Sequence, residues 1–241
     1  MSTGSSRLRI AAIGDLHVHE QAGAFKSVFS EASKHADILA LCGDLTQLGV
    51  PAEAEALASD LGACSIPVVG VLGNHDYQSG RATEVRKILQ AAKMVLLEEE
   101  SFEYQGVGFA GVKGFCGGFN RNMLTSFGED AIKQFVSESV NEALRLENSL
   151  RTLNTDRTIV VLHYAPITGT LQGEPLEIFP FLGSSRLAET IDLFDVTAVF
   201  HGHAHRGICE GRTNKGVPVY NCCYELMQRV TPSRPFTVIE V

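Results

Sequence analysis

Residues 9–17 read RIAAIGDLH, an apolar run that ends in glycine and is followed at once by aspartate and histidine. A similar arrangement recurs at residues 38–44, ILALCGD, and at residues 68–76, VVGVLGNHD. Short apolar runs that are bounded by turn residues are typical of strands buried on both faces. We therefore expect three buried strands, each followed directly by residue types that bind metals or take part in catalysis.

The segments between these strands have the apolar spacing of helices, which predicts helices at 21–35, 52–61 and 82–92. Pro51 suits the first turn of the second helix. Alternating strands and helices imply a parallel sheet with right-handed crossovers. Because the carboxyl ends of parallel strands meet at one edge of a sheet, the polar residues after the strands should converge there.

The rest of the chain predicts a different mixture of elements. Gln105-Gly106 predicts a hairpin turn between two short strands. The expected strands lie at 94–97, 101–104, 107–111, 158–162, 197–200, 207–209, 217–221 and 236–241. Helices are expected at 129–153 and 185–194. The first of these helices has a predicted apolar face that consists of Ile132, Phe135, Val136, Val140, Leu144 and Leu150.

The composition predicts a single domain over residues 1–241. With 44% apolar residues the chain can bury a full core, and no linker rich in Pro, Gly or Ser divides it. The formal net charge of −8 argues against a broad nucleic-acid-binding face, because phosphate backbones favour clustered Lys and Arg. No apolar run approaches the roughly 18 residues of a membrane helix, and the N-terminus has no apolar core. These features predict no signal peptide, no membrane span and a cytoplasmic location.

The six cysteines include no C-x-x-C pair. We therefore expect reduced, mostly buried thiols rather than a disulfide framework. A redox role of the adjacent Cys222 and Cys223 is the alternative, although adjacency alone does not lower a thiol pKa.

Two further apolar runs, TIVVL and TAVF, also end beside metal-ligand residue types. Each cluster alone has a structural explanation, since Asp and Asn are ordinary turn residues and a lone histidine is often a hydrogen-bonded core residue. Their joint occurrence after five apolar runs favours a metal site. Imidazole and oxygen ligands without thiolate suit Mn²⁺, Fe or Zn²⁺ rather than Ca²⁺. The candidate ligands are Asp15, His17, Asp44, Asn74, His163, His203 and His205.

The order and content of these clusters resemble the pattern D-x-H, G-D, G-N-H-D/E, H and G-H-x-H of the calcineurin-like metallophosphoesterase superfamily. The resemblance extends along nearly the whole chain. It implies an α/β fold in the form of a four-layer α/β/β/α sandwich, with two mixed sheets flanked by helices. It also implies two metal ions per chain that share Asp44 as a bridging ligand. The first ion would be held by Asp15, His17, Asp44 and His205, and the second by Asp44, Asn74, His163 and His203.

The same resemblance implies hydrolysis of a phosphoester by in-line attack of a hydroxide that bridges the two ions. His75 is then expected to contact the phosphate and to protonate the leaving group. Asp76 is expected to orient the imidazole of His75, with a turn-capping carboxylate as the structural alternative. His19 and His201 flank the clusters without matching the pattern, and we expect them beside the site or at the surface rather than as ligands.

Gln47 distinguishes this chain from the purple acid phosphatases, a related branch with a tyrosine ligand three positions after the bridging aspartate. His17 and the small size are more similar to the bacterial phosphodiesterase branch, which includes the class III cyclic-nucleotide phosphodiesterases. The favoured interpretation is therefore a phosphodiesterase acting on a small molecule, with a phosphomonoesterase left open. A nuclease and a non-catalytic scaffold are the alternatives, but the acidic charge disfavours the first and the complete set of ligands disfavours the second.

Two loops near the expected metal edge, at 113–128 and 166–184, are the candidates that set substrate choice. Loops of this length can equally form a structural lid or a dimer contact, and the oligomeric state is left open. The candidate contacts for a phosphate or a nucleoside are Lys113, Asn120 and Arg121, and the candidate stacking partners for a base are Phe115, Phe119 and Phe179.

Overall fold

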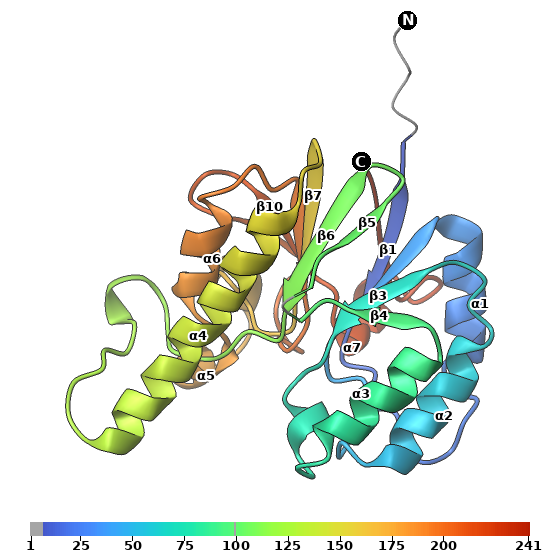
Figure 1. Cartoon of the computed structure of the whole chain (residues 1–241), viewed down its shortest axis with the longest axis horizontal. Coiled ribbons are helices and arrows are strands. Elements are labelled where there is room, and N and C mark those ends of the chain that lie inside the picture. The colour runs from blue at the N-terminus through green and yellow to red at the C-terminus, as the bar shows by residue number, and fades with distance from the viewer. Residues whose placement is uncertain (1–6, 99) are drawn as a thin grey trace, which may run out of the picture.

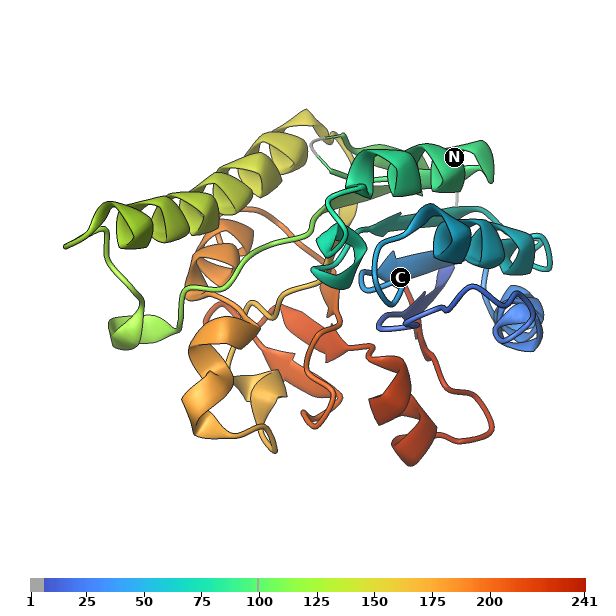
Figure 2. The same ribbon diagram turned by 90° about the horizontal axis from the view of Figure 1, so that it is seen from below.

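The computed structural model describes residues 7–98 and 100–241, and it contains two β-sheets that pack face to face. Helices lie on the outer side of each sheet, so that the chain forms four layers (Figure 1). Figure 2 shows these layers from below, with α4 (Asp130–Thr152) on one outer side and α1 (Lys26–His35) on the other. The predicted four-layer α/β/β/α sandwich is confirmed.

The first sheet has five strands in the order β11-β1-β2-β3-β4. Neighbours from β1 to β4 are parallel, and β11 runs antiparallel to β1, which makes the sheet mixed. Helices α1, α2 (Pro51–Leu61) and α3 (Ala82–Ala91) cover its outer face. The strands are β1 (Arg9–Ile13), β2 (Ile38–Cys42), β3 (Val68–Val71), β4 (Met94–Leu96) and β11 (Thr237–Glu240).

The second sheet has six strands in the order β5-β6-β7-β8-β10-β9, with parallel pairs in the centre and antiparallel strands at both edges. Helices α4 and α6 (Ser185–Ile191) pack on its outer face, and α5 (Phe179–Leu182) and α7 (Tyr224–Val230) lie in connections. Among the described residues, no helix combines the length and the apolar character that a membrane span needs. The strands are β5 (Phe102–Tyr104), β6 (Val107–Val112), β7 (Arg157–Leu162), β8 (Ala198–His201), β9 (Glu210–Arg212) and β10 (Pro218–Asn221).

Apolar side chains fill the space between the two sheets. Successive residues of a strand point to opposite faces, so a strand that is covered on both sides is apolar throughout. In β7, Ile159 and Val161 belong to the core between the sheets, whereas Val160 and Leu162 belong to the core under α4 and α6. This double burial explains why the sequence shows continuous apolar runs instead of alternation.

The structure differs from the predicted elements in three places. The helix expected at 21–35 begins only at Lys26, because the carboxylate of Asp60 accepts hydrogen bonds from the backbone N–H groups of Gly23 and Phe25 and holds the preceding residues in a turn. The strand expected at 207–209 is wrong, since β9 lies further along the chain, where it pairs with β10. Helix α7 was not predicted, because seven residues give too little apolar periodicity.

The apolar face predicted for α4 is partly wrong. Ile132, Val140 and Leu144 are 38%, 38% and 51% exposed, whereas Glu142 is buried. The carboxylate of Glu142 accepts a hydrogen bond from the backbone N–H of Gly114 at 2.6 Å, which compensates its burial. Apolar spacing alone therefore misplaces the packed face of a helix when a partnered polar side chain lies on that face.

Replacing Phe109, which is fully buried between the sheets, by Ala should lower the free energy of unfolding by about 3–5 kcal/mol, because a cavity remains. Leu144→Ala removes an exposed side chain of α4 and should change this free energy by less than about 0.5 kcal/mol. Urea denaturation followed by circular dichroism measures both variants. Equal losses for the two would contradict the packing described for α4.

Candidate metal centre

The candidate ligands lie where the parallel strands of both sheets end. Asp15, Asp44 and Asn74 follow β1, β2 and β3 of the first sheet. His163 and His203 follow β7 and β8 of the second sheet. The centre therefore lies across the boundary between the sheets, and both sheets contribute side chains to it.

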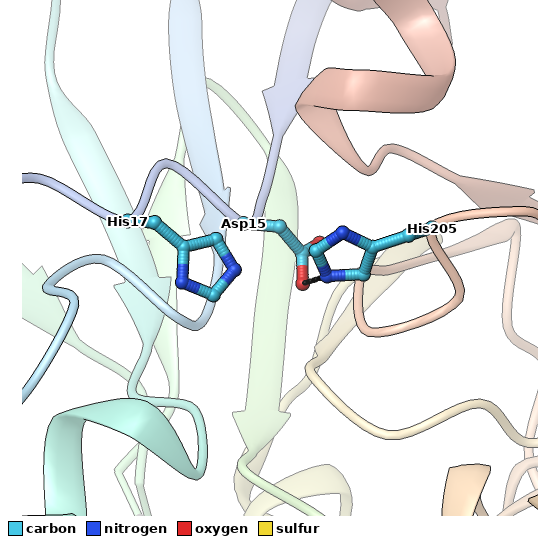
Figure 3. A group of neighbouring side chains, drawn as sticks. All are labelled: Asp15, His17 and His205. Atoms are coloured by element: carbon cyan, nitrogen blue, oxygen red, sulfur yellow. Dashed lines mark ion pairs between the residues drawn. The ribbon is translucent and has the colours of Figure 1, made fainter.

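These side chains form three overlapping groups of possible metal ligands, with donor atoms that lie within 4.8 Å of one another. Figure 3 shows one group, in which the ring of His205 faces the carboxylate of Asp15. Two residues, His17 and Asp44, each belong to two groups, so the three groups form one continuous centre. The groups are Asp15, His17 and His205; His17, Asp44 and His75; and Asp44, His163 and His203.

Four of these residues have a left-handed backbone conformation, which is rare for residues other than glycine. Their φ angles are 56° for Asp15, 46° for His17, 48° for Asp44 and 69° for His203. Each such residue costs on the order of 1–3 kcal/mol and persists only where its surroundings hold it. Here the backbone N–H of Asp15 donates to the carbonyl of Gly43, and that of His17 donates to the carbonyl of Asp44. The strain is the local consequence of turning successive side chains into one centre.

Glycines beside the ligands allow the loops to approach one another closely. A Cβ atom on Gly43 would lie 2.6 Å from the ring of His163. A Cβ atom on Gly73 would collide with the carboxylate and backbone of Asp44. The glycines in the Gly-Asp and Gly-Asn-His clusters are therefore required by the packing of the ligands.

Acceptor atoms in the third group face one another. The N–H of His163 Nδ1 donates to the carbonyl of Cys42 at 3.0 Å, and burial holds the pKa of His163 well below its ordinary value, so the ring is neutral at neutral pH. Its Nε2 lone pair therefore faces Oδ1 of Asn74 at 2.8 Å and Oδ1 of Asp44 at 3.3 Å. Among the described residues, neither ring nitrogen of His17 has a hydrogen-bond partner. A cation between these acceptors would satisfy them, so the residues fit metal ions.

The charges of the centre lead to the same conclusion. Burial, followed by the neighbouring Asp15 and Asp76, raises the pKa of Asp44 to about 9. The hydrogen bond to Asp15 raises the pKa of His205 to about 12, so a proton and a metal ion compete for the position between these two side chains. A bound cation would keep Asp44 ionised and would replace the proton on His205.

Besides His163, three histidines are oriented through the ring nitrogen that points away from the centre. Such contacts fix the tautomer and leave the other nitrogen for a metal or for proton transfer. Sequence reasoning missed these partners, because two are backbone carbonyls and the third lies in α7. The pairs are His75 Nδ1 with the Gln47 carbonyl at 2.7 Å, His203 Nε2 with the Phe181 carbonyl at 3.3 Å, and His205 Nδ1 with the Glu225 carboxylate at 3.1 Å.

Asp76 does not orient the imidazole of His75, which corrects the role predicted for it. Its fully buried carboxylate accepts hydrogen bonds from the backbone N–H groups of Gly73, Leu45 and Thr46 at 2.8 to 3.2 Å, and from the Thr46 hydroxyl at 2.6 Å. Asp76 therefore ties the loop after β3 to the loop after β2. Asp76 is therefore a turn-capping carboxylate, which is the structural alternative given above. The carbonyl of Gln47 orients the imidazole of His75.

His19, His201 and the adjacent cysteines belong to none of the three groups. His19 is exposed, whereas His201 is fully buried with its Nε2 at 2.8 Å from the Thr170 hydroxyl. Cys222 and Cys223 are buried free thiols, and burial raises the pKa of Cys223 to about 12. The buried members of this set support the packing behind the centre.

The predicted substrate contacts lie in two different places. The ammonium group of Lys113 lies over the rings of Tyr77, Phe115 and Tyr164, at 5.0 to 5.7 Å from their centroids. Asn120 and Arg121 are exposed and line a separate cleft. Of the predicted stacking residues, Phe119 is only 6% exposed, which leaves no free ring face for a base.

Asp76→Ala should lower the free energy of unfolding by about 3 kcal/mol or more, because it leaves buried donors in two loops without an acceptor. Glu84→Ala is the matched control, since it removes an exposed carboxylate that pairs with Arg81 and should cost about 0–1 kcal/mol. Urea denaturation measures the free energy of unfolding of both variants. If Asp76→Ala were as stable as the wild type, the carboxylate of Asp76 would not hold the two loops together.

Comparisons with known proteins agree with this geometry. A model of the calcineurin-like phosphoesterase family matches residues 8–207. The fold is similar to that of phosphopantetheinyl hydrolase from Mycobacterium tuberculosis, with a TM-score of 0.69 and 14% identity over 98% of this chain and 96% of that one. It is also similar to the protein TT1561 of Thermus thermophilus, with a TM-score of 0.57 and 17% identity over 97% and 99% of the two chains.

A comparison with curated protein sequences gives no match. At identities this low the structural likeness shows a shared fold and nothing finer. The family match, however, spans most of the sequence and includes every candidate metal ligand from Asp15 to His205. The resemblance implied by the clusters is thus confirmed, and the chain belongs to the calcineurin-like phosphoesterase family.

Proposed function

We propose that this chain hydrolyses small-molecule phosphodiesters with the help of two metal ions. The observation that carries this proposal is the position of Asp44 between two sets of donors. Its Oδ2 lies 3.9 Å from Nε2 of His17 and 4.0 Å from Nε2 of His75, whereas its Oδ1 lies 3.3 Å from Nε2 of His163. One carboxylate with its two oxygens directed to different donor sets is suited to bridge two ions.

The two donor sets give the proposed ligands. Mn²⁺, Fe and Zn²⁺ are the candidates, since the donors are imidazoles and oxygens. Two such ions, when bound, lower the pKa of a coordinated water and offset the negative charge of the phosphoryl group. The proposed ligands are Asp15, His17, Asp44 and His205 for one ion, and Asp44, Asn74, His163 and His203 for the other.

His75 is the proposed general acid. Its Nδ1–H donates to the carbonyl of Gln47, so Nε2 is the nitrogen that faces the centre. Its ring packs edge-on against the ring of His17, with centroids 4.5 Å apart. In the protonated form, Nε2–H would be placed to donate a proton to the leaving oxygen of the ester.

A preference for diesters follows from the residues around the centre. Gln47 occupies the position of the phosphatase tyrosine, and its backbone carbonyl is committed to His75. Of the two cations predicted to contact the substrate, Lys113 lies over aromatic rings and Arg121 lines a separate cleft, so neither is placed beside the donor sets to pair with the second charge of a monoester. The net charge of −8 disfavours the nuclease alternative, and the intact donor sets disfavour a scaffold without activity.

The protein reconstituted with Mn²⁺ should hydrolyse bis-p-nitrophenyl phosphate at least as efficiently as p-nitrophenyl phosphate. Steady-state kcat/KM for the two substrates measures this preference. Elemental analysis of the same sample should give two metal ions per chain. Asp44→Asn should abolish turnover, whereas Asp37→Asn, which alters a carboxylate paired with Arg9 near the surface, should retain it.

Either of two results would overturn this proposal. A kcat/KM for the monoester that exceeds the diester by about tenfold, which is about 1.4 kcal/mol of transition-state preference, would make the protein a phosphomonoesterase. One metal ion or none in active, unchelated protein would remove the bridging role of Asp44.

His75→Ala should retain both metal ions but lose about 10²–10⁴-fold in the rate of cleavage of an alkyl phosphodiester, because general acid catalysis typically contributes this much. The loss should be smaller for a p-nitrophenyl ester, since p-nitrophenolate leaves without a proton. Parallel measurement of kcat for the two leaving groups, with metal content as the control, tests this. Equal losses would mean that His75 only positions the substrate.

A further inference from the structure

The two loops singled out in the sequence, 113–128 and 166–184, enclose a cleft of about 590 Å³. Asn120, Arg121 and Asn122 form one wall, and Leu176, Phe179 and Pro180 form the other. Phe119 and Thr168 complete the lining, so that polar side chains predominate in the first wall and apolar side chains in the second. The cleft is not used by the chemistry at the metal centre.

The shape of the cleft is fixed, because hydrogen bonds join the two loops that form its walls. The backbone N–H of Gly117 donates to the carbonyl of Pro180 at 2.9 Å, and that of Gly118 donates to the carbonyl of Gly183 at 3.0 Å. The backbone N–H of Asn120 donates to the hydroxyl of Ser185 at 2.9 Å. Asn120 has a φ of 53°, a strained conformation that these contacts hold at the rim.

The chain segment that carries the apolar wall of the cleft also contacts candidate ligands of the metal centre through its backbone. Phe181, the residue after Pro180, accepts the ring N–H of His203 at its carbonyl. Ala165, two residues after His163, exchanges backbone hydrogen bonds with Leu182 and Ser184. Segment 180–184 therefore borders both the cleft and two of the candidate metal ligands.

The chemistry of the walls identifies what the cleft can bind. Leu176 is 74% exposed, an apolar surface that gains from being covered. Arg121 is the one charged residue among those that line the cleft, and within the described chain no carboxylate lies within 4.0 Å of its guanidinium group. A ligand with an apolar segment and an anionic group would satisfy both walls.

We propose that this cleft binds the organic arm of the substrate, and that this arm carries an apolar segment followed by a second anionic group that pairs with Arg121. This inference rests on the proposed function, because the phosphoryl group of the same molecule would lie at the metal centre. The cleft selects the substrate, whereas the metal centre cleaves it.

Phosphonates that are not hydrolysed test this binding without turnover. Isothermal titration calorimetry with the Mn²⁺-loaded protein compares the binding of four kinds of probe. Two carry one charged end, methylphosphonate and hexylphosphonate. The other two carry a charged group at both ends of a chain of four, six or eight carbons, and these are the ω-phosphonoalkanoates and the α,ω-alkanebisphosphonates. We expect the probes with an anionic group at both ends to bind about tenfold more tightly than methylphosphonate at one chain length or more. The affinity of hexylphosphonate should lie between these two. The carboxylate-ended and phosphonate-ended series distinguish the two sources of the second charge.

Two variants test whether the two walls of the cleft cause the tighter binding. Arg121→Met should remove the advantage of the anionic-ended probes over hexylphosphonate, and Leu176→Asp should remove the advantage of hexylphosphonate over methylphosphonate. Lys133→Met, which alters an exposed residue of α4 paired with Asp130, should change neither.

Equal binding of all probes at every length, or unchanged selectivity in both variants, would overturn the inference while leaving the metal chemistry intact. Failure to hydrolyse any nitrophenyl ester would instead overturn the proposed function, and the two failures are therefore distinguishable.

Discussion

The buried carboxylate of Asp44 is the constraint on which the centre depends. It is only 1% exposed, and Asp15 and Asp76 lie close enough to raise its pKa further. An ionised carboxylate that is moved out of water costs several kcal/mol unless donors or cations compensate it. The backbone N–H of His75 supplies one donor at 2.8 Å. A cation held by the surrounding imidazoles and oxygens would supply further compensation in place of a proton on Asp44.

This requirement explains why the centre lies across two sheets. The hydrogen bond from His163 to the Cys42 carbonyl joins the end of β7 to the end of β2, and the backbone N–H of His203 donates to both carboxylate oxygens of Asp15 at 2.9 Å. These contacts hold only while the apolar core keeps the sheets at a fixed separation. Four left-handed residues, at about 1–3 kcal/mol each, carry strain comparable with the entire stability of about 5–15 kcal/mol of a typical domain. The strained geometry of the centre therefore depends on the free energy that packing of the core supplies.

Local patterns were sufficient to predict most of the strands and to bring the candidate ligands to one edge, because every candidate ligand follows an apolar run within a few residues. They failed where a residue depends on a partner that is distant in the sequence. The burial of Glu142 depends on the backbone of Gly114, and the site of Asp76 depends on Thr46. Helix α7 was missed for the same reason, since contacts with the loop after β1 rather than its own periodicity hold it, as in the hydrogen bond from the backbone N–H of Tyr224 to the carbonyl of Gly14.

The partners that sequence patterns could not predict make the two proposed metal positions different. His205 is backed by the carboxylate of Glu225, which increases the basicity of its other nitrogen. His163 and His203 are backed by neutral backbone carbonyls. The first donor set also contains Asp15, whereas the second contains the neutral Asn74 in the corresponding place. The first position therefore carries more negative charge and would attract a cation more strongly, whereas an ion at the second position would keep more of its own charge uncompensated.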